Sequence, residues 1–209
     1  MLLQGNQGSL GKQVGQNLTA GLGETSDLLV TELQARYYEQ NYRGLTFFTS
    51  LAAAAPTAYA GAAGGTPLVA IYNPVGSGIN LVLKSALVSL VAAASAAGQT
   101  QFRLYGGPTA LPTGTFVAPY SASQLSQVGS RAKAVNNAAT TSSSALNYIA
   151  TIATYYWATA ASAFFVPPAA WDAAGQIIVV PGNMLALGAV TVPTSMTNDA
   201  TLFWDEVPI

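Results

Sequence analysis

Apolar residues recur along positions 45–209 in short runs, and glycine and proline separate these runs. Residues 101–105 alternate strictly between polar and apolar side chains, which is typical of an antiparallel strand with one face in solvent. A long apolar run at 79–91 follows turn-forming residues and contains Lys84, so we expect this lysine to leave the interior or to be paired there. The pattern predicts strands at 45–49, 67–72, 79–91, 101–105 and 201–207, and a strand–turn–strand unit over 175–187 with its turn at 181–183.

Two further segments lack a single clear pattern. Residues 110–147 are poor in large apolar side chains, which predicts long loops with short strands along one edge or face of the fold. In 145–165 the alanines favour a helix, whereas the aromatic residues and threonines favour strands, and we interpret the segment as two strands at about 147–156 and 158–165. The consecutive aromatic residues at 155–157 would then alternate between faces, which favours core packing or a subunit interface over a platform for stacking sugars.

The charged residues are concentrated near the N-terminus. Six of the fifteen lie in a 20-residue window, where acid–base pairs four residues apart and an approximate apolar stripe predict a helix over about 25–43 that ends at Gly44. Residues 1–23 are rich in Gly, Gln and Asn and are expected to form an extended or flexible arm. We therefore divide the chain into an arm with a short helix, 1–44, and a β-sandwich domain, 45–209. The predicted fold class is all-β: a jelly-roll-like β-sandwich preceded by an extended N-terminal arm and one short helix.

Composition limits the possible functions. The chain has seven basic and eight acidic residues, no histidine and no cysteine, whereas about a quarter of the residues in a typical domain are charged. A chain with so little charge either lies in a membrane or covers much of its surface with partner proteins. The most apolar stretch, 79–97, carries Lys84 and three serines, which argues against a membrane span. A net charge of −1 with scattered basic residues argues against nucleic-acid binding.

The sequence offers no catalytic, cofactor-binding or metal-binding constellation, so we predict that the protein is not an enzyme and holds no cofactor or metal. Without histidine, the serines at 142–144 lack the base of a serine triad. Asp205 and Glu206 are adjacent and point to opposite faces of a strand, so we interpret them as solvated charges near the end of the chain. Asp172 and Asp199 are expected in loops, without the spacing of a calcium site. A glycan hydrolase would need to use two of the eight carboxylates.

Several short motifs resemble accessory virion proteins of tailed bacteriophages, in which a helical arm precedes a β-sandwich. The first is RYYEQNYRG at 36–44, which is followed by two phenylalanines at 47–48. Similar motifs are YNPVGSG at 72–78 leading into LVLK at 81–84, the turn VPGN at 180–183, and FWDE at 203–206.

The resemblance implies a multi-copy virion component without an active site. Its strongest form is a capsid decoration or cement protein, made in the host cytoplasm and located on the capsid surface, with the major capsid protein and copies of itself (a dimer or trimer) as partners. Because Tyr and Arg are enriched among interface anchors, the predicted contact residues are Arg36, Tyr37, Tyr38, Tyr42 and Arg43. The alternative is a tail fibre or receptor-binding β-sandwich that recognises host-surface glycans through exposed aromatic residues and loop amides in 110–147.

Overall fold

The computed structural model divides the chain into two compact units, Met1–Tyr38 and Glu39–Ile209. In the first unit, β1 (Leu3–Gly5) pairs antiparallel with β2 (Leu18–Ala20). Most of the predicted arm and of the helix predicted over 25–43 lies outside the described residues. The structure describes residues 3–5, 18–20, 40–41, 43–92, 98–113, 115–125, 129–136, 143–157, 168–192 and 196–209.

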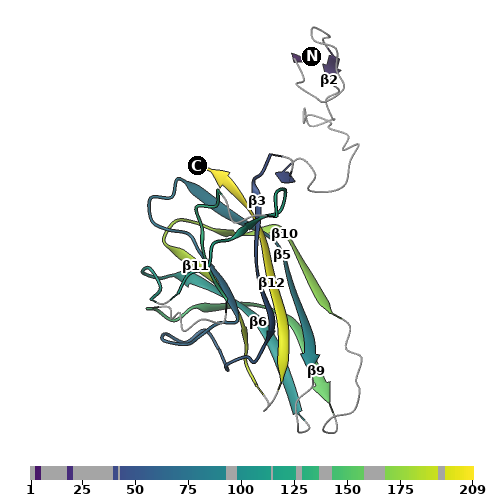
Figure 1. Cartoon of the computed structure of the whole chain (residues 1–209). Helices are drawn as coiled ribbons and strands as arrows, with labels where there is room; N and C mark the ends of the chain where they lie inside the picture. Colours follow the sequence, from purple (N-terminus) through teal and green to yellow (C-terminus); the bar gives the residue numbers. More distant parts are fainter. Residues whose placement is uncertain are drawn as a thin grey trace. The chain divides into compact units, whose positions relative to one another are not determined.

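The second unit is built from antiparallel strands, and its described residues from 43 onward contain no helix, so the all-β prediction is confirmed. Strands are found at each predicted position that the structure describes, and several are longer than predicted; the strand predicted at 158–165 lies outside the described part. The strands are β3 (Thr46–Ala54), β4 (Val69–Tyr72), β5 (Ile79–Ala92), β6 (Gly98–Pro108), β7 (Tyr120–Ser121), β8 (Lys133–Asn136), β9 (Asn147–Trp157), β10 (Ala169–Val179), β11 (Asn183–Ala189) and β12 (Thr197–Pro208) (Figure 1).

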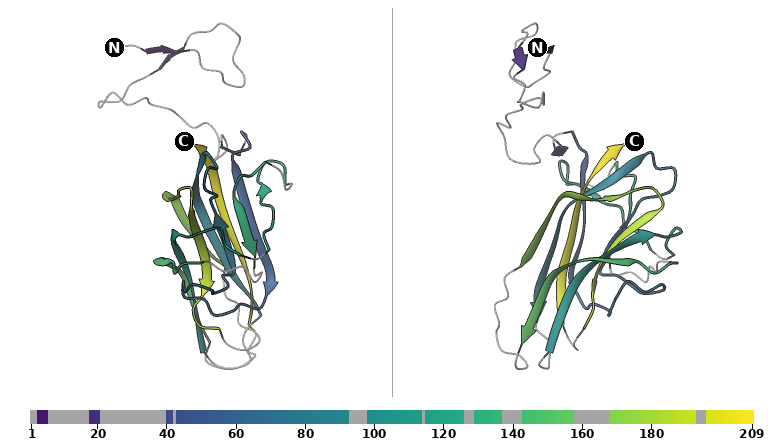
Figure 2. Two further views of the ribbon diagram at one scale, coloured as in Figure 1. Left: turned by 90° about the vertical axis from the view of Figure 1, so that its left-hand side faces the viewer. Right: turned by 180° about the vertical axis from the view of Figure 1, so that it is seen from behind.

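These strands form two five-stranded sheets that lie face to face as two layers (Figure 2). Sheet I has the order β10-β5-β12-β3-β7, and sheet II has the order β8-β4-β11-β6-β9. Apart from the short strands β7 and β8, the pairing is nested: β6 pairs with β9, β5 with β10, β4 with β11, and β3 with β12. Successive pairs alternate between the two sheets, so strands far apart in the sequence become neighbours.

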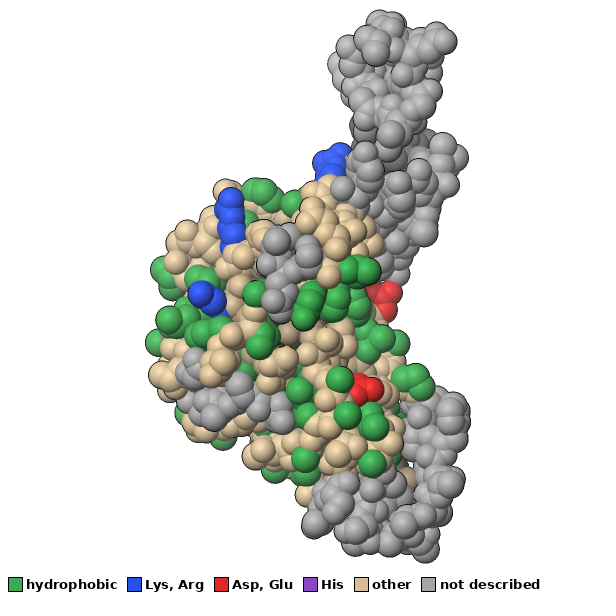
Figure 3. Space-filling model, in the orientation of Figure 1, with side chains coloured by type: hydrophobic (Ala, Val, Ile, Leu, Met, Phe, Trp, Pro, Cys, Tyr) green, Lys and Arg blue, Asp and Glu red, His purple; other side chains and the backbone are tan. Residues whose placement is uncertain are grey.

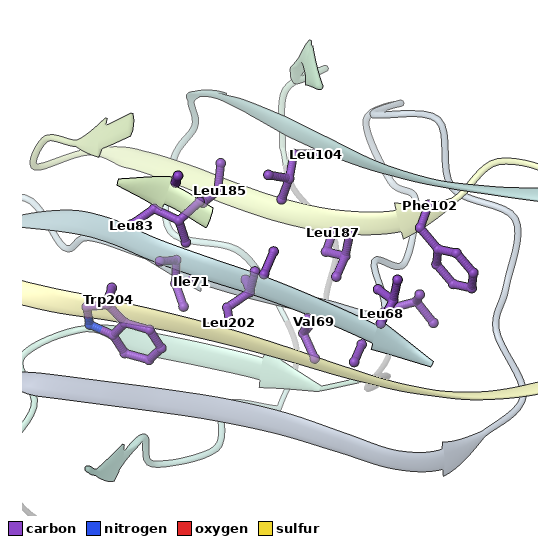
Figure 4. Packing of buried hydrophobic residues seen from close by; sticks show 14 of the residues in the cluster. Leu68, Val69, Ile71, Leu83, Phe102, Leu104, Leu185, Leu187, Leu202 and Trp204 are labelled. Atoms are coloured by element: carbon purple, nitrogen blue, oxygen red, sulfur yellow. The ribbon is translucent and has the colours of Figure 1, made fainter. Parts of the chain in front are cut away.

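The main hydrophobic core fills the space between the sheets (Figure 4). Leu202 and Trp204 on β12 are fully buried there, and they face Val69 and Ile71 on β4 and Phe102 on β6. Full burial of one such side chain contributes about 1.5–3 kcal/mol to folding. The alternation of apolar and polar residues along β6 and β12 therefore reflects one face in this core.

A second apolar cluster covers the other face of sheet II. Because Val69 and Ile71 point into the main core, Ala70 and Tyr72 point to the opposite face, and both are buried as well. The cover comes from loops and consists of Tyr59, Leu146 and the partly buried Phe116, packed with Tyr105, Val135, Met184, Ala186 and Val190. As predicted, part of segment 110–147 thus lies against one face of the fold.

Two predicted chain reversals have the expected glycine geometry. Gly44 has a φ of +70°, and its N–H donates to Asn41 O while Leu45 N–H donates to Gln40 O, each at 3.0 Å. This pair of hydrogen bonds is the glycine cap that ends a helix, in agreement with the predicted helix end at Gly44. The turn between β10 and β11 closes through a 3.1 Å bond from Asn183 N–H to Val180 O, with Gly182 at a φ of +84°.

Tyr155 on β9 connects the two sheets. Its ring packs edge-on against Phe102 at 5.7 Å, and its hydroxyl donates to Val88 O on β5 at 3.4 Å. Burial of the hydroxyl raises the pKa of Tyr155 above its ordinary value of 10.0, although a hydrogen bond with the backbone of Ala169 acts in the opposite direction. The neighbouring Tyr156 is exposed, so these two consecutive aromatic residues do split between faces.

We expect the stability of the protein to fall at alkaline pH, in part because of Tyr155. Its raised folded-state pKa means that the neutral phenol stabilises the fold fully below pH 10, and that this contribution is lost as the pH rises through the folded-state pKa. In denaturant unfolding, Tyr155→Phe should therefore lose less stability than the wild type between neutral pH and a pH above 10. Equal losses in the two proteins would contradict this role, and Tyr156→Phe is the matched control.

Candidate interaction surface

Asp205 and Lys84 form a buried ion pair, so the interpretation of Asp205 as a solvated charge is wrong. Lys84 Nζ donates to Asp205 Oδ1 at 3.2 Å and to Thr46 Oγ1 at 3.1 Å, and the Thr46 hydroxyl also donates to Asp205. The side chains are only 6% and 12% exposed, respectively. The lysine within the apolar run of β5 is thus paired, which is one of the two outcomes expected from the sequence.

Glu206 is also buried rather than solvated, and it anchors the loop before β8. Its Oε1 accepts hydrogen bonds from Ser130 Oγ at 2.6 Å and from Ala132 N–H at 3.3 Å, and both of its carboxylate oxygens accept from Arg131 N–H at 3.1 Å. The carboxylate therefore satisfies backbone donors that would otherwise lie unpaired beside the core. It ties β12 of sheet I to the beginning of β8 in sheet II.

The two isolated aspartates lie on strands and not in loops, which corrects the expectation from the sequence. Asp199 on β12 accepts hydrogen bonds from Ala53 N–H at 2.7 Å and from Ser89 Oγ at 3.2 Å. Asp172 on β10 accepts from Ala174 N–H at 2.8 Å, where the pairing of β10 with β5 shifts register. Both aspartates thus accept hydrogen bonds where the pairing of their strands shifts register.

All four acidic residues in the described part of the chain are therefore engaged in structural hydrogen bonds. No group of three or more Asp or Glu side chains that could hold a metal ion occurs among the described residues. In the same residues, no helix is long and apolar enough to cross a membrane.

One end of the sandwich carries no charged residue in four neighbouring segments, which we call the uncharged end. It consists of residues 73–78, 109–113, 143–149 and 180–183. Its exposed large apolar side chains are Val75, at 80% exposure, Leu111, at 54%, and Tyr148, Ile149 and Val180. Several exposed apolar side chains at one end of a fold are a feature of protein contact sites.

Hydrogen bonds join these segments into one continuous surface. Asn73 N–H donates to Asn183 O at 2.9 Å, and Gly182 N–H donates to Asn73 O at 2.8 Å. The side-chain amide of Asn73 is fully buried and donates to Ile79 O and Val179 O, both at 2.8 Å. Hydrogen bonds from the backbone and from the Asn73 side chain thus hold these segments of the uncharged end in place.

The segment at 109–113 is fixed to the same end by separate contacts. Thr109 N–H donates to Gly182 O at 3.1 Å, and Ala110 N–H donates to Ser143 Oγ at 3.1 Å. A small cavity of about 120 Å³ lies beside it, between Ile149 and residues 177–179. At the margin, Arg131 Nη1 donates to Ser77 O at 3.1 Å. The Arg103 guanidinium lies 5.5 Å from the centre of the Tyr148 ring, so two basic groups border the uncharged end.

A larger cavity of about 300 Å³ lies in the region that the sequence suggested for glycan binding. Its lining includes Phe116, Pro119, Ser130 and Lys133. The Lys133 ammonium lies 5.7 Å from the centre of the Phe116 ring. On the face of the molecule shown in Figure 3, basic and acidic side chains are few and separated from one another.

Of the predicted contact residues, the structure describes only Arg43, which is exposed in the turn before β3. Arg36, Tyr37, Tyr38 and Tyr42 lie outside the described residues, so their contact role stays a prediction. We did not predict the uncharged end from the sequence, because each of its turns, taken alone, looks like an ordinary surface turn.

No protein-family model, no curated protein and no solved structure matches this chain.

We expect Asp205→Asn to destabilise the fold by about 3–5 kcal/mol, because it removes the carboxylate that pairs with the buried Lys84 ammonium. The measurement is urea unfolding at neutral pH. Asp172→Asn is the matched control and should change stability by less than about 0.5 kcal/mol, because Asp172 is exposed and Asn can accept the same backbone hydrogen bond. The double variant Lys84→Met/Asp205→Asn should lose less than Asp205→Asn alone, and an equal or larger loss would contradict this account.

Proposed function

We propose that this protein is a structural component of a bacteriophage particle, a capsid decoration or cement protein built on a jelly roll. The nested pairing of β3–β6 with β9–β12, with successive pairs in alternate sheets, is the strand order expected of an eight-stranded jelly roll to which β7 and β8 add short edge strands. Viral capsid domains and lectins are among the proteins that use this architecture. The fold alone does not decide between such functions.

The motifs that resemble phage accessory proteins come together in space, which supports the proposal. The YNPVGSG and VPGN motifs meet at the uncharged end through the bonds of Asn73 to Gly182 and Asn183. The FWDE motif pairs directly with the two phenylalanines that follow the arm, since Phe203 lies opposite Phe48. These separate stretches of sequence therefore form two local structures.

The observation that carries the proposal is the uncharged end itself. Exposed apolar side chains on a hydrogen-bonded frame are suited to a protein interface, whose buried centre is depleted of charge. We infer that the uncharged end docks on the capsid shell and that the N-terminal arm, 1–44, adds a second attachment to neighbouring subunits.

We expect Leu111→Asp and Val75→Asp each to weaken loading onto capsids by at least tenfold, because each buries a charge where an apolar side chain would dock. Loading is measured by co-sedimentation with capsids that lack this protein. Leu125→Asp is the matched control, because Leu125 is 74% exposed but lies outside the uncharged end. Equal loading of all three variants and the wild type would refute docking through this end.

Removing residues 1–38 should also reduce loading, while the β-domain stays folded. This deletion leaves Gly44 and Leu45 in place, and Leu45 O accepts a 2.9 Å hydrogen bond from Glu206 N–H. The measurement is the stoichiometry of protein on the capsid at saturation, with circular dichroism as the check on folding. Unchanged binding by the truncated chain would show that residues 1–38 of the arm do not contribute to attachment.

The alternative, a tail-borne module that recognises host glycans, is favoured by the cavity beside Phe116 and Lys133. An aromatic ring next to an ammonium group and loop amides suits a sugar that carries a carboxylate. Binding on a glycan array that is lost in Lys133→Ala, together with no loading onto capsids, would favour this alternative. Capsid loading at fixed stoichiometry without glycan binding would favour the decoration protein.

A further inference from the structure

The outer face of sheet I differs from that of sheet II in what covers it. Loops carrying Tyr59, Phe116 and Leu146 pack over sheet II. Among the described residues, no comparable apolar cluster covers the outer face of sheet I. This outer face, which we call the aromatic face, consists of Phe48 and Ser50 on β3, Val82, Ser85 and Leu87 on β5, Tyr120 on β7, Ala170 on β10, and Thr201 and Phe203 on β12.

The orientation of these side chains follows from the core. Because Leu202 and Trp204 point inward, Thr201 and Phe203 point outward. The cross-strand register then places the residues opposite them on the same outer face. The aromatic face is thus fixed by the packing behind it.

Three aromatic rings form a continuous row across this face. Phe203 stacks on Phe48 at 5.3 Å, and Phe48 stacks on Tyr120 at 5.4 Å. Tyr120 is 38% exposed, and the two phenylalanines are half-buried. A sheet face in contact with water usually carries polar side chains, so this row has the character of a surface that a protein covers.

The distribution of charge allows the aromatic faces of two copies to meet without strong repulsion. Lys84 and Asp205 neutralise each other within the chain, whereas Asp199 on β12 accepts two hydrogen bonds from neutral donors and keeps its negative charge. Asp172 is the exposed charge, and it lies on the edge strand β10. Two copies would therefore bring few like charges together, because Asp199 lies near the beginning of β12, four residues before Phe203 in the row of aromatic rings.

The face is also large enough for a stable contact. Four long strands spaced about 4.8 Å apart, over the nine residues of β3 at about 3.4 Å each, span roughly 19 by 31 Å, or about 600 Å². With β7 and the adjoining loops, this approaches the roughly 800 Å² per partner of a standard interface. Two such sheets can stack about 10 Å apart with their side chains interleaved.

We infer that a second copy of this chain packs on the aromatic face, sheet I against sheet I, to form a two-fold dimer. A contact in which the same surface meets itself is isologous and closes after two copies. This inference does not depend on capsid docking, since the uncharged end and the aromatic face use different side chains. The dimer is therefore tested with the purified protein alone.

The experiment is light scattering coupled to size-exclusion chromatography, over a range of micromolar concentrations. The wild type should have twice the mass of one chain, and Ser50→Arg and Thr201→Arg should each weaken dimerisation at least tenfold by placing like charges on facing sheets. Gln99→Arg is the matched control, because Gln99 is an exposed strand residue of sheet II. It should leave the dimer intact.

Circular dichroism and thermal unfolding establish that each variant is folded, and Ser85→Arg replaces any variant that is not. A monomeric wild type, a closed trimer, or dimers that persist in folded Ser50→Arg and Thr201→Arg would each overturn the inference. Loss of capsid loading without a change in mass would instead concern only the proposed function.

Discussion

Strand β12 lies at the centre of sheet I, hydrogen-bonded to β5 on one side and to β3 on the other, and its two-residue alternation is the constraint on which the rest of the structure depends. With Leu202 and Trp204 in the core, Thr201, Phe203 and Asp205 must lie on the outer face. A slip of one residue would expose the indole ring and carry the carboxylate into the apolar core. The cost of either change fixes the register, and through it the position of every neighbouring strand.

Three consecutive residues at the end of β12 serve three different parts of the molecule. Trp204 fills the core, Asp205 compensates the buried charge of Lys84, and Glu206 holds the loop that leads into β8. Breaking a buried ion pair from one side leaves an uncompensated charge, so the two partners depend on each other far more than an exposed pair would. The Glu206 contact additionally ties the edge of sheet II to the centre of sheet I.

Sequence patterns that span only a few residues predicted the strands and turns well. Contacts between residues far apart in the sequence could not be predicted. The alternation at 101–105 and the turn at 181–183 are local, and both were predicted correctly. Asp205 looked solvated because its partner Lys84 is 121 residues away in the sequence. The continuous apolar run of β4 did carry a usable signal, since a strand without alternation is typical of burial on both faces. The uncharged end gave no such signal, because it exists only once four separate segments are brought together.

The small number of charged residues affects both the interior and the surface of the β-domain. Inside, Lys84, Asp199, Asp205 and Glu206 are all engaged in internal hydrogen bonds, so few charges are left for the surface. A surface with little net charge promotes association, and the uncharged end and the aromatic face are two such surfaces that differ in geometry. The uncharged end is formed by loops together with the adjoining ends of β9 and β11, whereas the aromatic face lies along the length of the strands of sheet I. Contact through one therefore leaves the other accessible, so the proposed dimer and the proposed docking on a capsid are compatible with each other.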